Sequence, residues 1–140
     1  FLQSGDRLRT DRLCSDGACV EALTALTFRR DAVSADELGM DAVNEWTLQL
    51  LRVRHLGQAE QRLHALLVLL VNRLGMRRRD CFQLPFRLTH ERFGELIGAT
   101  RVTTTRLLSK WRQSDLVEMS SIDLTTRLSP ALVESSPLSF

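Results

Sequence analysis

Two arginines in a threonine-rich stretch are the residues of this chain best suited to recognise a ligand. The stretch TRVTTTR begins at Thr100. An arginine can bind the O6 and N7 atoms of guanine in a bidentate way, and each such contact is worth roughly 1 to 3 kcal/mol of discrimination. The hydroxyls of Thr100 and Thr103, with the unpaired amides of a helix start, can hold phosphates. On a helix the outward-facing residues would be Arg101, Val102, Thr105 and Arg106.

A second helix must pack behind the first to present these side chains. Thr89 can cap such a helix, and Gly94 within it would let the second helix approach closely. Gly98 falls where the turn between two helices commonly needs a positive φ. The pattern from Thr89 to Trp111 therefore predicts a helix-turn-helix that binds double-stranded DNA, although Thr104 stands where an apolar residue is usual. The residues expected to face inward are Phe93, Leu96, Ile97, Leu107, Leu108 and Trp111.

The charge of the chain supports a polyanionic ligand. The net charge is only +2, but residues 62–112 hold eleven Lys or Arg and three Asp or Glu, a local charge of +8. A local basic field attracts polyanions whatever the global charge. Arg77, Arg78 and Arg79 form the densest run, and their type alone also fits a solvated link between elements.

A long helix is predicted upstream, starting at a capping box from Ser34 to Glu37. The sequence stays helix-like for over thirty residues without proline. After Gly57 the apolar pattern shifts, which leaves a bend or a new helix open, and Gly75 is a natural helix end. One apolar stripe has the alternating spacing of a coiled-coil seam and predicts a homodimer, although it could pack on the chain's own N-terminal strands. The stripe contains Val43, Trp46, Leu50, Val53 and Gly57.

The remaining segments have weaker patterns. Residues Ala18 to Phe28 are typical of a strand, and Arg77 to Leu88, with Pro85 between apolar residues, predicts a linker with an edge strand. The fold class expected is mainly α with small β (α+β). It comprises residues 1–33 with a strand-like pattern, 34–75 as a dimerisation helix with a following helix, and 76–140 as the part that carries the helix-turn-helix.

The segment LTHERFGELIGATRVTTTRLLSKWRQSDLV, from Leu88 to Val117, resembles the DNA-binding domain of the Crp/Fnr superfamily of transcription regulators. Within it TRVTTTRLL is similar to the cyanobacterial nitrogen-control activators. The resemblance implies a homodimer on a palindromic site, contact with RNA polymerase, and half-sites like GTA and TAC. It also implies that residues 1–33 are the remnant of an N-terminal β sensor region and that residues 76–140 are a winged helix-turn-helix domain, with a wing hairpin from Val117 to Thr125. It implies base contacts by Arg101, Val102 and Arg106. Phosphate or positioning contacts are expected from Thr100, Thr103, Thr105, His90 and Lys110.

Other classes of function find little support in the sequence. Cys14, Cys19 and Cys81 form neither a CxxC pair nor an even set, which argues against a disulfide framework and a zinc site. No membrane span, cofactor or nucleophile and base set is recognisable, so the chain is expected to be a cytoplasmic protein and not an enzyme. Regulators of this superfamily normally carry a sensor of over a hundred residues ahead of the long helix, whereas about thirty residues precede that helix here. Neither the phosphate cassette of a cyclic-nucleotide site nor the cysteine cluster of the iron-sulfur branch is recognisable, so no small-molecule effector can be assigned. A protein-interaction adaptor that reuses the winged fold stays as the alternative.

Overall fold

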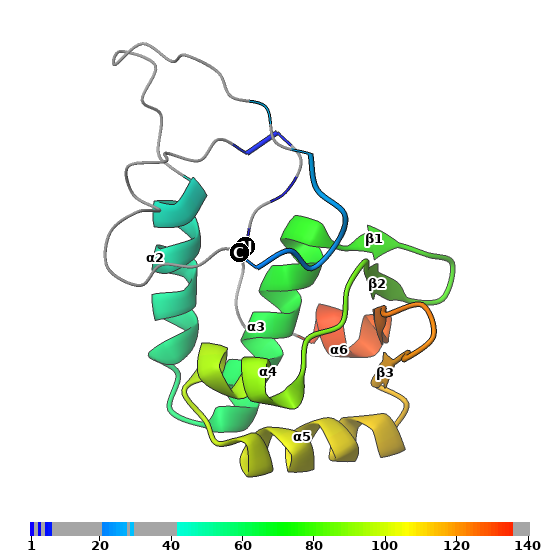
Figure 1. Ribbon diagram of the computed structural model, residues 1–140. Coiled ribbons are helices and arrows are strands. Elements are labelled where there is room, and N and C mark those ends of the chain that lie inside the picture. The colour runs from blue at the N-terminus through cyan, green and yellow to red at the C-terminus, as the bar shows by residue number, and fades with distance from the viewer. Residues whose placement is uncertain (2, 4, 7–20, 28, 30–41, 136–140) are drawn as a thin grey trace. The chain divides into compact units, whose positions relative to one another are not determined.

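The computed structural model describes residues 1, 3, 5, 6, 21 to 27, 29 and 42 to 135 (Figure 1). They divide into two compact units, Phe1–Leu48 and Gln49–Phe140, each described by itself. In the first unit the ring of Phe1 lies against Trp46, with 5.2 Å between centroids. The strand expected over Ala18 to Phe28 is described only from residue 21 to residue 27, where none is present. Leu23 and Leu26 are exposed there.

Two helices take the place of one continuous helix. Helix α2 (Ala42–Arg54) crosses from the first unit into the second, and α3 (Ala59–Leu74) follows after four residues. The shift of pattern after Gly57 therefore marks a new helix. Nη1 of Arg62 donates hydrogen bonds to the carbonyls of Leu56 at 2.9 Å and of Gly57 at 3.1 Å, which fixes the connection. The capping box from residue 34 to residue 37 lies outside the described residues.

Helix α3 is the central element of the second unit. Seven consecutive residues, Ala65–Val71, are buried, because this helix is apolar on nearly every side. It ends where expected, at Gly75, whose N–H donates to the carbonyl of Val71 at 2.9 Å. A Cβ at Gly75 would lie 2.6 Å from that oxygen, so glycine permits a close approach here, with an ordinary negative φ of −82°. Among the described residues no helix is long and apolar enough to cross a membrane.

Four short antiparallel strands form one sheet in the order β1-β2-β4-β3. They are β1 (Met76–Arg77), β2 (Phe82–Leu84), β3 (Val117–Met119) and β4 (Thr126–Leu128). One face buries Leu84, Val117 and Leu128, while the other aligns Gln83, Arg127 and Glu118 in register. The prediction of an edge strand beside Pro85 is wrong, because β2 lies between two strands. The proline follows the last residue of β2, so its missing N–H costs the sheet no hydrogen bond.

Three further helices complete the second unit: α4 (His90–Ile97), α5 (Arg101–Gln113) and α6 (Pro130–Glu134). In Figure 1, α4 and α5 lie near the end of α3 at which that helix begins, and α6 lies close to the sheet. The predicted α+β class is confirmed, with helices as the main component.

Candidate nucleic-acid interface

Helix α4 and the turn after it have the geometry that the sequence predicted. The hydroxyl of Thr89 accepts a hydrogen bond from the N–H of Arg92 at 3.2 Å. Phe93 and Ile97 are fully buried, and Leu96 is half-buried. A Cβ at Gly94 would lie 2.7 Å from the carbonyl oxygen of Ala99. Gly98 has a φ of +63°, in the left-handed region that favours glycine, so the chain reverses sharply and α5 begins three residues later, at Arg101.

Helix α5 buries one face against this support. Thr100 caps it by accepting a hydrogen bond from the N–H of Thr103 at 3.2 Å. Leu107, Leu108 and Trp111 are buried, as expected. Thr104 is fully buried as well, and its hydroxyl donates to the carbonyl of Thr100 at 3.1 Å. The internal hydrogen bond explains how a threonine occupies a position where an apolar residue is usual.

The opposite face of α5 is open to solvent over its first half. Arg101, Val102 and Arg106 are exposed, and 78% of Val102 is accessible. Thr103 and Thr105 are half-buried beside them. An apolar residue at such exposure, flanked by two arginines, has no packing role within the described part of the chain. The structure thus brings the predicted base-contacting side chains onto one accessible surface.

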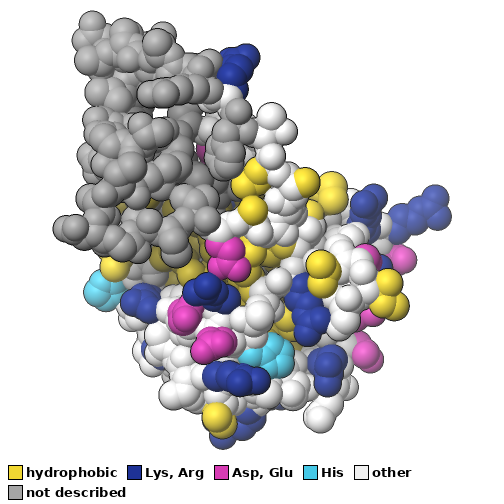
Figure 2. All heavy atoms as spheres, in the orientation of Figure 1, with side chains coloured by type: hydrophobic (Ala, Val, Ile, Leu, Met, Phe, Trp, Pro, Cys, Tyr) yellow, Lys and Arg dark blue, Asp and Glu magenta, His cyan; other side chains and the backbone are white. Residues whose placement is uncertain are grey.

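His90 joins the start of α4 to this surface. Its Nδ1 shares a hydrogen bond of 2.9 Å with the hydroxyl of Thr105. Burial lowers the pKa of His90, and the positive charges of Arg87, Arg101 and Arg112 lower it further. Three guanidinium groups therefore create a positive potential around the imidazole, which suits an anion. Figure 2 shows several Lys and Arg side chains on the face that carries α4 and α5, with acidic side chains among them.

A shallow groove runs from the loop before α4 to the start of α5. Arg87 and Leu124 border it, and neither was predicted from the sequence as a site residue. The only sequence signal for Arg87 is its place in the basic segment. The residues lining the groove are Arg87, Leu88, Thr89, His90, Glu91, Arg101 and Leu124.

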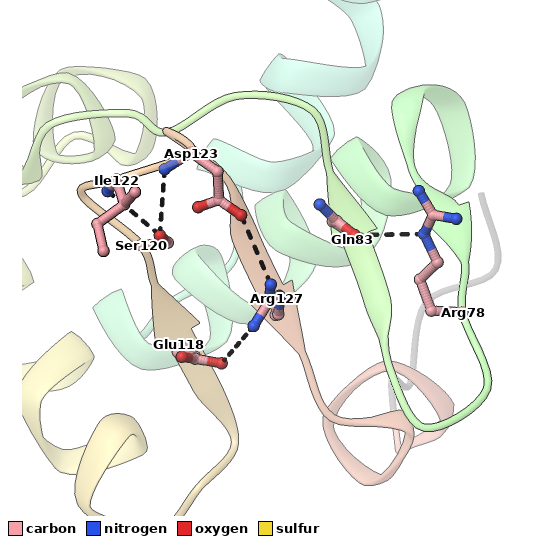
Figure 3. A network of polar contacts seen from close by, with 7 residues as sticks. All are labelled: Arg78, Gln83, Glu118, Ser120, Ile122, Asp123 and Arg127. Carbon is pink, nitrogen blue, oxygen red and sulfur yellow. Dashed lines mark hydrogen bonds and ion pairs between the residues drawn. The ribbon is translucent and has the colours of Figure 1, made fainter.

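The predicted wing hairpin is formed by β3 and β4, and side chains organise its turn in the absence of glycine. Arg127 forms ion pairs with Glu118 at 3.3 Å and with Asp123 at 3.5 Å (Figure 3). The hydroxyl of Ser120 accepts hydrogen bonds from the N–H groups of Ile122 at 3.3 Å and Asp123 at 3.4 Å. Leu124 has a φ of +52°, a conformation that such a turn would more often assign to glycine.

A hydrogen bond also connects the wing with a residue that lines the groove. Nη1 of Arg87 donates to the hydroxyl of Ser121 at 2.6 Å. One side chain thus connects the approach to α4 with the tip of the hairpin. Helix α5, the start of α4 and the wing together form a surface of the kind that a winged helix-turn-helix presents to duplex DNA.

Comparison with known proteins identifies this arrangement. Residues 61–129 match the family model of the Crp-like helix-turn-helix domain, and residues 1–43 match that of the cyanobacterial CRP family N-terminal domain. The chain is 32% identical over 140 residues to the regulatory protein CysR of Synechococcus elongatus, covering 96% of this chain and 68% of CysR. The chain belongs to the Crp family of transcription regulators.

Other relatives agree with this assignment. A global nitrogen regulator from Synechocystis sp. is 31% identical over 88 residues, which are 63% of this chain and 38% of that protein. The resemblance to nitrogen-control activators found in the sequence is thereby confirmed. These relatives are regulators of transcription and not enzymes.

Two solved structures show the same fold. A CRP-family transcriptional regulator from Thermus thermophilus superposes with a TM-score of 0.57 at 17% identity, covering 77% of this chain and 57% of that one. A CooA mutant from Carboxydothermus hydrogenoformans gives 0.54 at 23% identity, covering 66% and 43%.

Lys110 of this Crp-family chain has a partner within the protein. Its ammonium lies 2.8 Å from Oε1 of Glu60, and Nε1 of Trp111 donates to the same oxygen at 3.3 Å. The hydrogen bond from Lys110 is the main reason why the pKa of Glu60 is lowered. The ion pair therefore fastens the C-terminal half of α5 to the first turn of α3, and the phosphate contact expected of Lys110 stays a prediction.

The predicted dimer stripe is divided in the structure. Trp46 and Val53 are buried in the single chain, Leu50 is half-buried, and Val43 and Gly57 are exposed. Large apolar side chains elsewhere on α2 are exposed to a similar degree or more, namely Leu48 and Leu51.

The arginine run lies away from the recognition surface. Arg77 ends β1, at the sheet edge opposite β3, and its guanidinium stacks over the ring of Phe82 at 5.3 Å. Nε of Arg78 donates to Gln83 at 3.3 Å (Figure 3). Arg78 and Arg79 are exposed. The densest basic run of the sequence is therefore separate from the arginines around His90.

Proposed function

We propose that this regulator binds double-stranded DNA sequence-selectively, as a homodimer on a palindromic site, with α5 in the major groove. The observation that carries the proposal is the contrast between the two faces of α5. One face is buried on the protein core, and the other presents Arg101, Val102 and Arg106 to solvent. A helix of this kind, supported by a preceding helix, fits the major groove.

The roles of the exposed residues follow from their chemistry. Arg101 and Arg106 read guanine through O6 and N7, and Val102 contacts the methyl group of thymine. The hydroxyls of Thr100 and Thr103, which lie 3.0 Å apart at the helix start, contact phosphate and set the register. Further positioning contacts come from His90, Thr105 and Lys110.

The dimer contact would use the exposed side of α2. Because Trp46 and Val53 are buried within one chain, they add little apolar surface to an interface. Val43, Leu48 and Leu51 are 40%, 53% and 49% exposed and supply it instead. A two-fold axis along this contact would present two α5 helices to half-sites about 34 Å apart, one turn of DNA. RNA polymerase is a further expected partner, as for a regulator of transcription.

Selection from a random duplex library, followed by footprinting, tests the proposal. A palindromic consensus is expected, and equal affinity for unrelated duplexes at physiological salt would contradict it. Arg101→Ala should relax the preference at one base pair of each half-site, at a cost of roughly 1 to 3 kcal/mol per contact. Arg79→Ala is the matched control, because it removes the same charge at a distant exposed position.

Sedimentation tests the dimer separately. Leu51→Lys should shift the protein toward the monomer, whereas Ile122→Lys, which changes an exposed apolar residue of the wing, should not. An unchanged mass for Leu51→Lys would place the interface elsewhere.

A further inference from the structure

Arg54 makes a contact between two distant parts of the second unit. It is the last residue of α2, and its Nε donates to the carbonyl of Leu96 at 3.1 Å. Its Nη2 donates to the carbonyl of Glu95 at 2.5 Å. These hydrogen bonds span more than forty residues of sequence, and the end of α2 lies beside α4 in Figure 1.

The two carbonyls that accept these bonds belong to the last turn of α4. The last four carbonyls of a helix have no partner within it, and a cation is stabilised there by the helix dipole. The guanidinium therefore supplies both donors and charge where α4 needs them. It also lies over the turn, because its nearest atoms are 3.8 Å from the position that a Cβ on Gly98 would occupy.

That turn determines the direction of α5. Only three residues separate α4 from α5, and Gly98 among them has a positive φ. The N–H of Ala99 donates to the carbonyl of Gly94 at 2.9 Å, so the turn is closed on α4. A change in the last turn of α4 would therefore alter the angle at which Arg101 and its neighbours meet DNA.

The end of α2 that carries Arg54 is itself held in place. Val53 is fully buried, and Arg62 binds the carbonyls of Leu56 and Gly57 just beyond α2. Arg54 thus projects from a fixed support. Its exposure to solvent and its two hydrogen bonds distinguish it from a residue that only fills the core.

We infer that Arg54 is a positioning residue for sequence-specific DNA binding. It holds the last turn of α4 against the end of α2 and so fixes the orientation of the recognition helix α5. The inference rests on the proposed function. Since α2 is also the helix proposed to contact a second copy of the chain, Arg54 links the dimer contact to the DNA-reading turn.

The test compares Arg54→Met, Arg54→Lys and the control Arg52→Met in the whole chain. Arg52 lies one half-turn away on α2 and donates to Gln49 of its own helix at 3.1 Å. Its replacement removes the same charge from α2 and leaves in place the two hydrogen bonds from Arg54 to α4. Affinity is measured for the selected palindrome and for an unrelated duplex of equal length, over a range of salt concentrations. Circular dichroism and unfolding midpoints are recorded for every variant.

Arg54→Met should lower the ratio of specific to non-specific affinity roughly tenfold, the effect of losing hydrogen bonds to a charged group. Arg54→Lys should recover part of it. Arg54→Met should match Arg52→Met in non-specific affinity and salt slope, and Arg54→Lys, which keeps the positive charge, should match wild type in both. The ratio is decisive because lost charge or partial unfolding would lower both affinities together.

Two outcomes would overturn the inference: a wild-type ratio in Arg54→Met, or equal losses in Arg54→Met and Arg52→Met. If Arg54→Met fails to fold, the ratio measured for Arg54→Lys decides in the same way. Absence of discrimination by the wild-type protein would instead contradict the proposed function itself.

Discussion

Replacing Gly94 by alanine would introduce a methyl group at the closest approach between α4 and the turn into α5. The added Cβ would lie 2.7 Å from the carbonyl oxygen of Ala99 and 3.3 Å from the hydroxyl of Thr104. The carbonyl is part of the backbone and cannot rotate away as a flexible side chain could. The turn and α5 must therefore move outward by several tenths of an ångström.

The expected cost combines two opposing effects. Forcing an extra carbon into a well-packed site costs roughly 1 to 3 kcal/mol. Alanine is favoured over glycine within a helix by about 1 kcal/mol, which offsets part of that cost. The free energy of unfolding should fall by about 1 kcal/mol, which corresponds to a decrease in Tm of about 2 to 4 °C for a chain of this size.

Urea unfolding followed by tryptophan fluorescence measures this loss, and binding to the selected duplex reports the displacement of α5. Gly57→Ala is the matched control, because a Cβ there has no heavy atom within 4 Å and Gly57 has no positive φ. That variant should keep both stability and DNA affinity. Wild-type stability and affinity in Gly94→Ala would refute the close contact.

Three further variants test other contacts of α4 and α5. Burial and three arginines lower the pKa of His90 in the unbound protein, and DNA phosphates should raise it in the complex. The affinity for DNA should therefore fall as pH rises from the pKa of the unbound protein to that of the complex. His90→Gln should flatten that pH profile in binding isotherms, and an unchanged profile would exclude His90 as its source. Glu60→Gln should cost about 0.5 to 1 kcal/mol of stability in urea unfolding at neutral pH. Because the pKa of Glu60 is lowered in the folded protein, the stabilisation by its ion pair is lost as pH falls through that pKa, and the variant should then be as stable as wild type. A difference in stability that persists in acid would contradict the ion pair. Thr104→Val should change stability by no more than about 1 kcal/mol, because the carbonyl of Thr100 keeps its backbone hydrogen bond. A larger loss in urea unfolding would show that the hydroxyl is essential.

The recognition element could be predicted from the sequence because its determinants are local. Thr89 and Thr100 cap helices through bonds to residues three positions ahead, and Gly98 meets a backbone requirement at its own position. Such signals do not depend on the rest of the chain. The burial of Phe93 and Ile97 likewise follows from helical spacing.

The packing of α2 could not be predicted in the same way. Periodicity identifies an apolar face but does not say whether the chain itself or a partner covers it, and Trp46 and Val53 proved to be buried in one chain. The break before α3 was signalled by the change of pattern after Gly57. The bonds of Arg62 that hold it are a product of the folded chain.

Contacts between distant residues were equally outside the reach of the sequence. No local pattern distinguishes Arg54 and Arg87 from the other arginines of the sequence. Their roles come from contacts made in the folded chain, of Arg54 with α4 and of Arg87 with the wing. The strand expected over Ala18 to Phe28 was wrong for a different reason. Its composition suits a strand, but the described residues of that segment, 21 to 27, form none.

The wing turn has a consequence for the thermodynamics of binding. In the unbound protein Leu124 already has its positive φ, and side-chain contacts of Arg127, Ser120 and Arg87 hold the hairpin turn. A segment ordered before it meets its ligand loses little conformational entropy on association. A flexible, glycine-rich wing would lose this conformational entropy when it binds DNA, whereas the wing of this protein loses it when the chain folds.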